Sequence, residues 1–417
     1  MRHELASTKY FYGQVEFEDD VFVAKKPVSN LIYIDAGEGD VILRNITVEG
    51  NDLVSAHGIF IRRANKVMVE DCGFYNCFCS FRTYWDVNEC YIANSRFSGH
   101  RIALQLQSKR DEVSSCHFNC PSKGLRLREM IPSGPRAFEL YGGEKLVSRC
   151  VIEADGLGET IVSKVEARRA IITDTSFKIH NPGYTYILPT GKPYPAWDTA
   201  ITLSGGELEL SNCYISFDYP SSSGIGVLNV KNTIIKSNQI FNGSVSIEPA
   251  RHPVVNVGEV LVSDNYISNP RIGIRTYIPA KRKFAKLEIT GNVIDVSGSM
   301  PDIGAYTGIG VVLNTHPASV IEDVAVRLNR FFCKPGKPAI LVNQGVVSNL
   351  RMARNLARAG DLVFVSDKAT VKNLVKSFNI IAFPRENAWL AKLAYIRFRA
   401  KQRSLKALYR IRDRLGW

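Results

Sequence analysis

Aromatic, amide, basic and acidic residues gather in one stretch of this chain. Residues 82–86 read RTYWD, and two further polar pairs follow them, Gln105 with Gln107 and Glu139 with Tyr141. Flat aromatic rings suit the C–H faces of sugar rings, and planar polar groups suit their paired hydroxyls. These residue types together indicate carbohydrate recognition.

Two of the acidic residues are candidates for bond cleavage. Glycoside hydrolysis needs a pair of carboxylates, about 5–5.5 Å apart for retention or about 6.5–9.5 Å apart for inversion. Asp86 and Glu139 are the predicted pair, with Asp155 and Glu159 as substitutes. A polysaccharide lyase would instead use Tyr141, Lys164 or Arg82 as a base.

The predicted site therefore has a catalytic and a binding set. The catalytic set is Arg82, Asp86, Glu139 and Tyr141. The substrate-binding set is Arg62, Tyr84, Trp85, Gln105, Gln107, Lys164, Tyr184, Tyr194 and Trp197. The alternative is that these side chains only solvate an exposed sheet.

Two long insertions interrupt the chain near these residues. Residues 119–136 carry Lys123, Arg126, Arg128 and Arg136, and residues 181–198 carry three tyrosines and a tryptophan among Pro and Gly. Long loops in compact domains are often functional. The second insertion has the composition of a loop that lines a sugar-binding site. The alternative is a loop that only covers a flank of the fold.

The elements that must position these residues are set by an internal repeat. Residues 67–74, 208–215, 260–267 and 287–294 share the pattern apolar, any, apolar, polar, small polar, Cys or Asn, any, apolar. The period within a unit is two, which predicts strands. The sixth position recurs as Ile46, Cys72, Ser95, Cys116, Cys150, Thr175, Cys213, Asn238, Asn265, Asn292, Asn329, Asn355 and Asn379. Stacked units would place this position at a corner, where small polar side chains form a hydrogen-bonded ladder.

This repeat resembles that of the right-handed parallel β-helix family, which includes pectate lyases, polygalacturonases, polysaccharide epimerases and phage tailspikes. The resemblance implies an all-β, single-stranded solenoid of about 12–13 rungs over residues 41–383, after an N-terminal cap and first strands at residues 1–40. An antiparallel sandwich is the alternative. The catalytic motifs of polygalacturonases and pectate lyases are not matched, so the resemblance names no activity.

The net charge of +13 is concentrated at the C-terminus. Residues 387–417 hold nine Lys or Arg and one acid, so the preceding chain carries only +5. Apolar residues there recur at spacings of three and four, which predicts a basic amphipathic helix over 384–417. The basic residues expected to bind an anionic membrane are Lys392, Arg397, Arg399, Lys401, Arg403, Lys406, Arg410, Arg412 and Arg414. Capping of the solenoid and binding of a partner protein are the alternatives, and nucleic acid is not an expected partner.

The N-terminal residues and the cysteines bear on the cellular compartment. There is no apolar leader, and the nine cysteines are odd in number and lack paired C-x-x-C spacing, which favours free thiols in the cytoplasm. No metal site and no cofactor are expected. The predicted function is a carbohydrate-active enzyme, of hydrolase, lyase or epimerase type, acting on a polysaccharide or lipid-linked glycan at the cytoplasmic face of a membrane. A glycan-binding or scaffolding protein and a phage tail depolymerase are the alternatives.

Overall fold

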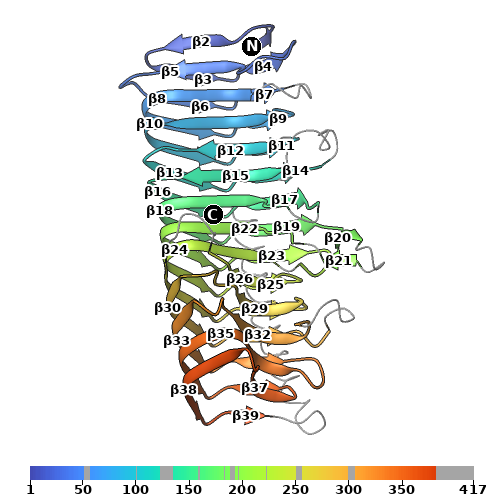
Figure 1. Ribbon diagram of the computed structural model, residues 1–417. Coiled ribbons are helices and arrows are strands. Elements are labelled where there is room, and N and C mark those ends of the chain that lie inside the picture. The colour runs from blue at the N-terminus through green and yellow to red at the C-terminus, as the bar shows by residue number, and fades with distance from the viewer. Residues whose placement is uncertain are drawn as a thin grey trace, which may run out of the picture.

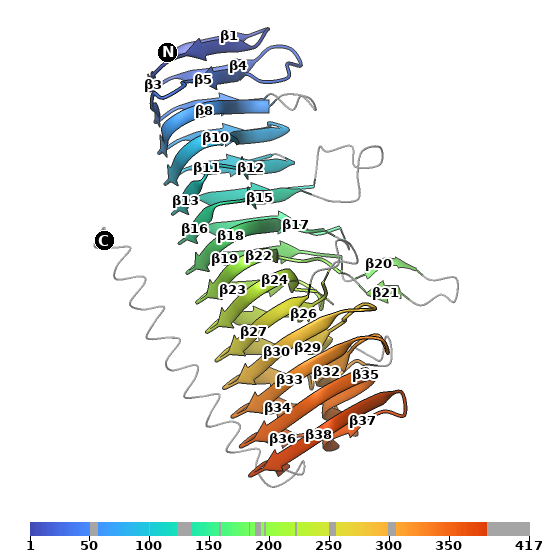
Figure 2. The same ribbon diagram turned by 60° about the vertical axis from the view of Figure 1, so that its left-hand side comes forward.

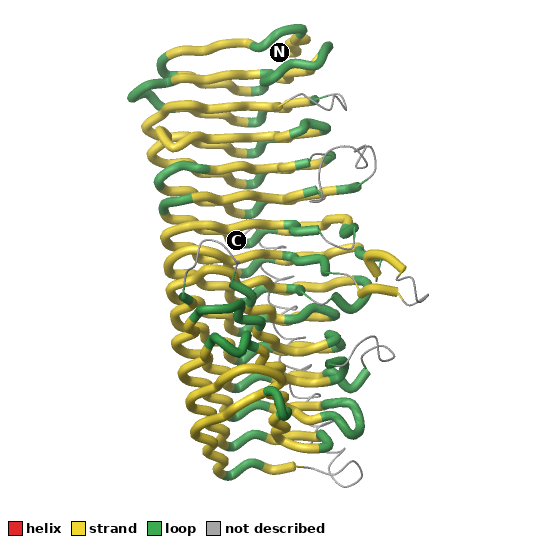
Figure 3. Tube along the Cα trace, viewed as in Figure 1, coloured by secondary structure: helices red, strands yellow, loops and turns green. Residues whose placement is uncertain are grey.

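The computed structural model describes residues 1–50, 57–99, 101–122, 135–157, 160–182, 184–187, 193–195, 197–221, 223–249, 256–298 and 306–381. These residues form strands, turns and loops and no helix (Figure 3). Of residues 184–187 and 193–195 only the backbone is described. None of the described residues belongs to a helix that could span a membrane.

One parallel sheet of 15 strands runs the length of the molecule. Its strands follow one another in chain order, so each is added next to the one before it (Figure 1). They are β1 (Arg2–Leu5), β4 (Val21–Ala24), β7 (Thr47–Glu49), β9 (Gly73–Tyr75), β11 (Arg96–Ser98), β14 (His117–Cys120), β17 (Val151–Asp155), β19 (Ser176–His180), β23 (Tyr214–Phe217), β25 (Gln239–Phe241), β28 (Tyr266–Ser268), β31 (Val293–Asp295), β34 (Arg330–Phe332), β36 (Leu356–Arg358) and β39 (Ile380–Ile381).

A second parallel sheet has pairings that close on themselves. In its first part it consists of β2 (Lys9–Tyr12), β3 (Val15–Glu18), β5 (Ile32–Asp35), β6 (Val41–Arg44), β8 (His57–Glu70), β10 (Cys79–Ala93), β12 (Ile102–Leu106), β13 (Arg110–Ser114), β15 (Arg136–Tyr141), β16 (Glu144–Ser148) and β18 (Ser163–Thr173). It continues with β22 (Ile201–Ser211), β24 (Ile225–Lys236), β26 (Val245–Ile247), β27 (Val257–Ser263), β29 (Ile272–Thr276), β30 (Lys283–Thr290), β32 (Ile309–Asn314), β33 (Val320–Arg327), β35 (Pro338–Ala353), β37 (Asp361–Val365) and β38 (Ala369–Ser377).

The closure comes from long strands that each pair with two shorter ones. Strand β8 pairs with β5 through its first half and with β6 through its second. Its sequence lacks a Gly or Pro between the two halves, so the chain continues through the position where shorter strands turn. Two ribbons that would otherwise be separate are thereby joined into one sheet.

The predicted fold class, a simple single-stranded solenoid of about 12–13 rungs, is therefore wrong, although the all-β prediction is confirmed for the described residues. The described strands form a 15-stranded parallel sheet and a second, closed parallel sheet, and an antiparallel pair, β20 (Tyr184–Ile187) with β21 (Pro193–Pro195), projects beside them (Figure 2). The predicted number of rungs was too low because strands within the first 40 residues also join these sheets. The predicted helix at 384–417 lies outside the described residues.

The core lies between the two sheets and follows from the period-two pattern. Inward residues of successive strands stack like on like, as Phe74, Phe97 and Phe118 do with ring centroids 4.9 and 5.1 Å apart. All nine cysteines are free and buried. The outward residues of each strand remain available to build a surface.

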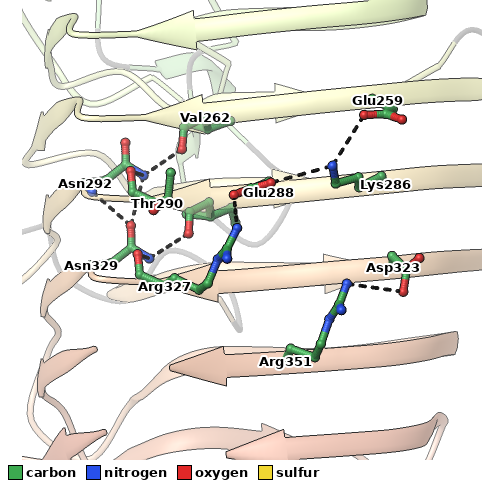
Figure 4. A network of polar contacts seen from close by, with 11 residues as sticks. Glu259, Val262, Lys286, Glu288, Thr290, Asn292, Asp323, Arg327, Asn329 and Arg351 are labelled. Atoms are coloured by element: carbon green, nitrogen blue, oxygen red, sulfur yellow. Dashed lines mark hydrogen bonds and ion pairs between the residues drawn. The ribbon is translucent and has the colours of Figure 1, made fainter. Parts of the chain in front are cut away.

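The predicted corner ladder is confirmed. The backbone N–H of Asn265 donates to Asn292 Oδ1 at 2.9 Å. The backbone N–H of Asn292 donates in turn to Asn329 Oδ1 at 3.0 Å, and Figure 4 shows these two residues side by side. The residue before each of the 13 repeat positions has a positive φ, as Asp264 does with 55°. This left-handed residue turns the chain, and mostly Asn, Asp, Ser or Gly occupies it. The ladder then satisfies the backbone groups that the turn leaves unpaired.

Candidate functional site

Four polar residues form one row across adjacent strands of the second sheet. Arg82 of β10 pairs with Gln105 of β12, Gln105 with Glu139 of β15, and Glu139 with Lys164 of β18. Partners in parallel strands lie about 4.8 Å apart and point to the same face. The sheet therefore brings together four of the predicted site residues.

The Glu139 carboxylate lies at the centre of this row. Its side chain is only 5% exposed and forms an ion pair with Arg136. Gln105 Nε2 donates to Glu139 Oε2 at 2.9 Å, and the Tyr141 hydroxyl donates to the same oxygen at 3.0 Å. These three donors hold the carboxylate in one orientation.

Tyr141 serves this arrangement as a hydrogen-bond donor. Burial raises the pKa of the Tyr141 phenol, although nearby Arg136 opposes that shift. The Lys164 ammonium lies 5.0 Å from the centroid of the Tyr141 ring and 3.1 Å from Glu166. A phenol with a raised pKa keeps its proton at neutral pH, so Tyr141 is poorly suited to the predicted role of base.

Two exposed aromatic residues stand beside the row because β10 bulges there. Thr83 pairs with Ile61 and Asp86 with Arg63, so Tyr84 and Trp85 together face only Arg62 of β8. Tyr84 is 38% and Trp85 49% exposed. Such bulges re-aim side chains next to functional sites.

The Trp85 ring reaches the end of the strand that carries Glu139. A Cβ added at Gly142, which has a φ of +67°, would lie 2.6 Å from Trp85 Cζ3. Because Gly142 has no side chain, the Trp85 indole can occupy the space beside it. Trp85 is thus placed next to Tyr141, on the same part of the surface.

Asp86 and Glu139 are not register neighbours. Asp86 lies two strands and about four positions away, which places the two Cα atoms roughly 15 Å apart. This backbone separation is larger than the distance between the carboxyl groups of a hydrolytic pair, so it disfavours the predicted pairing. Asp86 instead faces Arg63, whose guanidinium donates to Asp35 at 2.7 and 2.9 Å. Arg62 Nη1 lies 3.8 Å from the same Asp35 carboxylate.

Several polar atoms near the row have no hydrogen-bond partner among the described residues. They are Arg82 Nε, Gln107 Oε1 and Arg136 Nε, and each is buried. The Arg82 guanidinium lies 5.3 Å from the centroid of the Phe60 ring. Buried polar atoms without partners require an explanation such as a bound ligand or water.

The insertion residues are placed differently. Tyr184 and Tyr194 lie on the antiparallel pair β20–β21, and their side chains are outside the described residues. Trp197 stacks on Arg275, with 4.4 Å from the guanidinium to the ring centroid. Arg275 is four strands beyond Lys164 in the same row, roughly 19 Å away. Trp197 therefore does not join the group around Glu139.

Three residues near Glu139 were not among the predicted site residues: Arg136, Glu166 and Gly142. Arg136 is the last basic residue of the first insertion and precedes Glu139 by three positions. Glu166 lies two positions after Lys164, and its register partner is Tyr141. Gly142 directly follows Tyr141, and the pair Gly142–Gly143 was the available signal that the strand ends there.

The row is mostly open as far as Lys164, and most of its later members are buried. Thr202, Ser246, Val312 and Leu341 are at most 7% exposed, whereas Arg275 is partly exposed and Phe364, the last member, is 52% exposed. Among the described residues, no group of three His, Cys, Asp or Glu could hold a metal ion. The four predicted site residues of this row, Arg82, Gln105, Glu139 and Lys164, all lie in its mostly open part.

No protein-family model matches this chain, and no curated protein matches it in sequence. Its resemblance to the parallel β-helix family remains a prediction.

Proposed function

We propose that this protein binds a glycan on the open part of the second sheet, around Glu139, Tyr141, Tyr84 and Trp85. The observation that carries the proposal is a buried carboxylate, held by three donors, beside a half-exposed tryptophan. Binding sites for small polar ligands combine aromatic walls with a few positioned polar groups. Arg82 and Gln107 are partly exposed and supply further polar groups for sugar hydroxyls.

Binding is better supported than the predicted catalysis. The backbone separation of roughly 15 Å between Asp86 and Glu139 disfavours the predicted hydrolytic pair. The raised pKa of Tyr141 argues against proton abstraction by its phenolate. The glycan-binding protein is therefore the leading proposal.

Inverting hydrolysis is a second candidate because of Glu166. One strand and two positions separate Glu139 from Glu166, which places their Cα atoms about 8 Å apart. Both side chains point to the same face of the sheet, so their carboxyl groups can reach the separation of an inverting pair, about 6.5–9.5 Å. The Glu166 side chain is 53% exposed, whereas that of Glu139 is buried.

A binding screen over immobilised acidic and neutral polysaccharides tests the proposal. The full chain is expected to bind at least one of them, and Trp85→Ala or Glu139→Gln is expected to weaken that binding about tenfold or more, which is 1.4 kcal/mol or more. Tyr214→Ala removes an aromatic of similar exposure from the other sheet and serves as the control. Retention of full binding by both site variants would exclude this site.

The same bound polysaccharide tests hydrolysis. Release of reducing ends that is lost in both Glu139→Gln and Glu166→Gln would establish the second candidate. Binding without release of reducing ends would leave the glycan-binding proposal alone.

We further propose that residues 387–417 attach the protein to an anionic membrane surface, at the cytoplasmic face. The support is their net charge of +8 over 31 residues, with apolar residues interspersed. Each Lys or Arg near anionic headgroups contributes about 1 kcal/mol. A membrane location would suit a lipid-linked glycan as the bound molecule.

A further inference from the structure

A row of aromatic side chains leads from the N-terminal end of the molecule to the proposed site. Tyr10 of β2 pairs with Tyr33 of β5, and Tyr33 pairs with Phe60 of β8. Adjacent ring centroids in this row lie 5.4 Å apart. The row contains three aromatic residues on three successive strands, all on the outward face.

This aromatic row continues directly into the polar one. Phe60 pairs with Arg82, and Arg82 with Gln105, so the register is unbroken from Tyr10 to Lys164. Tyr84 adds a further ring, in edge contact with Phe60 at 6.4 Å. The aromatic and polar residues therefore form one continuous row, which runs perpendicular to the strands.

The aromatic row is not required by the core. The inward neighbours Ile34, Ile59 and Ile61 are fully buried and fill the interior, whereas Tyr10 is 59% exposed. Tyr33 and Phe60 are partly exposed. Contiguous exposed apolar surface of this kind marks an interaction site.

The groups beside the rings favour a carbohydrate as the occupant. The Asp35–Arg63 ion pair and the exposed Arg62 lie next to Tyr33 and Phe60 along the strands, so the apolar ring faces are edged by hydrogen-bonding groups. A sugar ring has the matching character, with an apolar face and polar edges. One strand spacing is also close to the length that one sugar unit adds to an extended chain.

We infer that Tyr10, Tyr33 and Phe60 form additional subsites for a linear glycan that runs along the stack, across the strands. This inference rests on the proposed function. From Tyr10 to Lys164 the surface spans six strand intervals, or roughly 29 Å, which accommodates a chain of about six sugar units. The aromatic row holds one half of that chain and the Glu139 group holds the other.

The test is the dependence of affinity on chain length. The probes are trimers and hexamers cut from the polysaccharide that the full chain retains most strongly. The wild type is expected to bind the hexamer more tightly than the trimer. Tyr10→Ala combined with Tyr33→Ala is expected to weaken hexamer binding roughly fivefold to tenfold, which is about 1–1.4 kcal/mol, and to leave trimer binding unchanged.

Two further variants distinguish failure of this inference from failure of the proposed function. Trp85→Ala should weaken both oligomers, and the exposed single variant Tyr10→Ser gives a smaller loss for the hexamer if the double variant does not fold. Hexamer binding that is insensitive to Tyr10 and Tyr33 overturns the inference but not the proposed function. Absence of binding by the wild type to every polysaccharide and oligomer overturns both.

Discussion

Asp111 and Lys145 face each other inside the molecule, on the adjacent strands β13 and β16. Both side chains are fully buried and form an ion pair, and Lys145 Nζ also donates to the Ser108 carbonyl at 2.6 Å. The residues around this pair include the buried Cys90, which is the register partner of Asp111 on β10. Charged side chains are rarely buried unless they are paired, so each residue requires the other.

Burial makes this pair sensitive to pH. It raises the pKa of Asp111 to about 6, although Lys145 and Ser108 oppose the shift. The folded protein therefore binds a proton at Asp111 more readily than the unfolded chain does. The stability that this difference provides is present below about pH 4 and is lost as the pH rises to about 6.

We expect the free energy of unfolding of the wild type to fall, relative to that of Asp111→Asn, between about pH 4 and pH 6. The expected fall is on the order of 3 kcal/mol, and urea unfolding at a series of pH values measures it. The variant isolates Asp111 because asparagine does not titrate. Parallel pH profiles of the two proteins would contradict a raised pKa at Asp111.

At the scale of single residues, the sequence identified candidate site residues more successfully than it identified pairs of residues in contact. It singled out Arg82, Gln105, Glu139 and Lys164, which the structure places in one row. It did not reveal the Asp111–Lys145 pair, because charged residues at inward positions break the alternation from which the core is predicted.

At the scale of the elements, the corner ladder is the feature that the repeat predicted best. Asn292 accepts from the backbone N–H and the side-chain amide of Asn265, each at 2.9 Å. Its side-chain amide donates to the Val262 carbonyl at 2.8 Å (Figure 4). It also donates to Asn329 Oδ1 at 2.9 Å. Every one of these groups is buried, so the ladder joins consecutive strands through satisfied polar contacts.

Asn292→Ala is expected to lower the free energy of unfolding by about 3 kcal/mol or more, because it leaves buried donors and acceptors unpaired. Chemical denaturation measures the change. Asn373→Ala is the matched control: Asn373 is exposed and donates one side-chain hydrogen bond, to Asn349 Oδ1. Equal losses for the two variants would show that the ladder does not stabilise the stack.

The strand register could not be predicted to the same extent. A shift of two residues leaves every side chain on the same face, so the hydrophobic pattern cannot exclude it. Gln105 could thus be placed beside either Arg82 or Tyr84, and the structure pairs it with Arg82. The bulge at Tyr84 and Trp85, which separates Asp86 from Glu139, carries no Gly or Pro signal in the sequence.

On the scale of the whole molecule, the stack has an open and a covered part along one face. The row is polar from Arg82 to Lys164 and mostly accessible there, and most of its later members are buried, apart from the partly exposed Arg275 and the exposed Phe364. The last described strands expose Phe364, Leu374, Val375, Phe378 and Ile380. Charge is divided as well, with +8 on residues 387–417 and +5 on the rest of the chain.

Liposome flotation tests the membrane proposal. The full chain is expected to float with vesicles of anionic lipid, and a chain that ends at Arg385 is expected to remain unbound, because the basic residues supply the attraction. A full-length variant with Lys392, Arg397, Arg399 and Lys401 changed to Glu is the matched control. Equal flotation of all three would exclude membrane attachment through this segment, and a lower melting temperature of the shortened chain would then favour its role as a cap.

The central claim is that a glycan binds the open part of the second sheet. Hydrogen–deuterium exchange of the full chain, with and without the polysaccharide that it retains in the screen, tests this claim most directly. We predict slower exchange in peptides from Cys79–Ala93 and Arg136–Tyr141, and no change in those from Ile309–Asn314 or Pro338–Ala353. Slower exchange confined to the last two ranges, or no change in the first two, would contradict it.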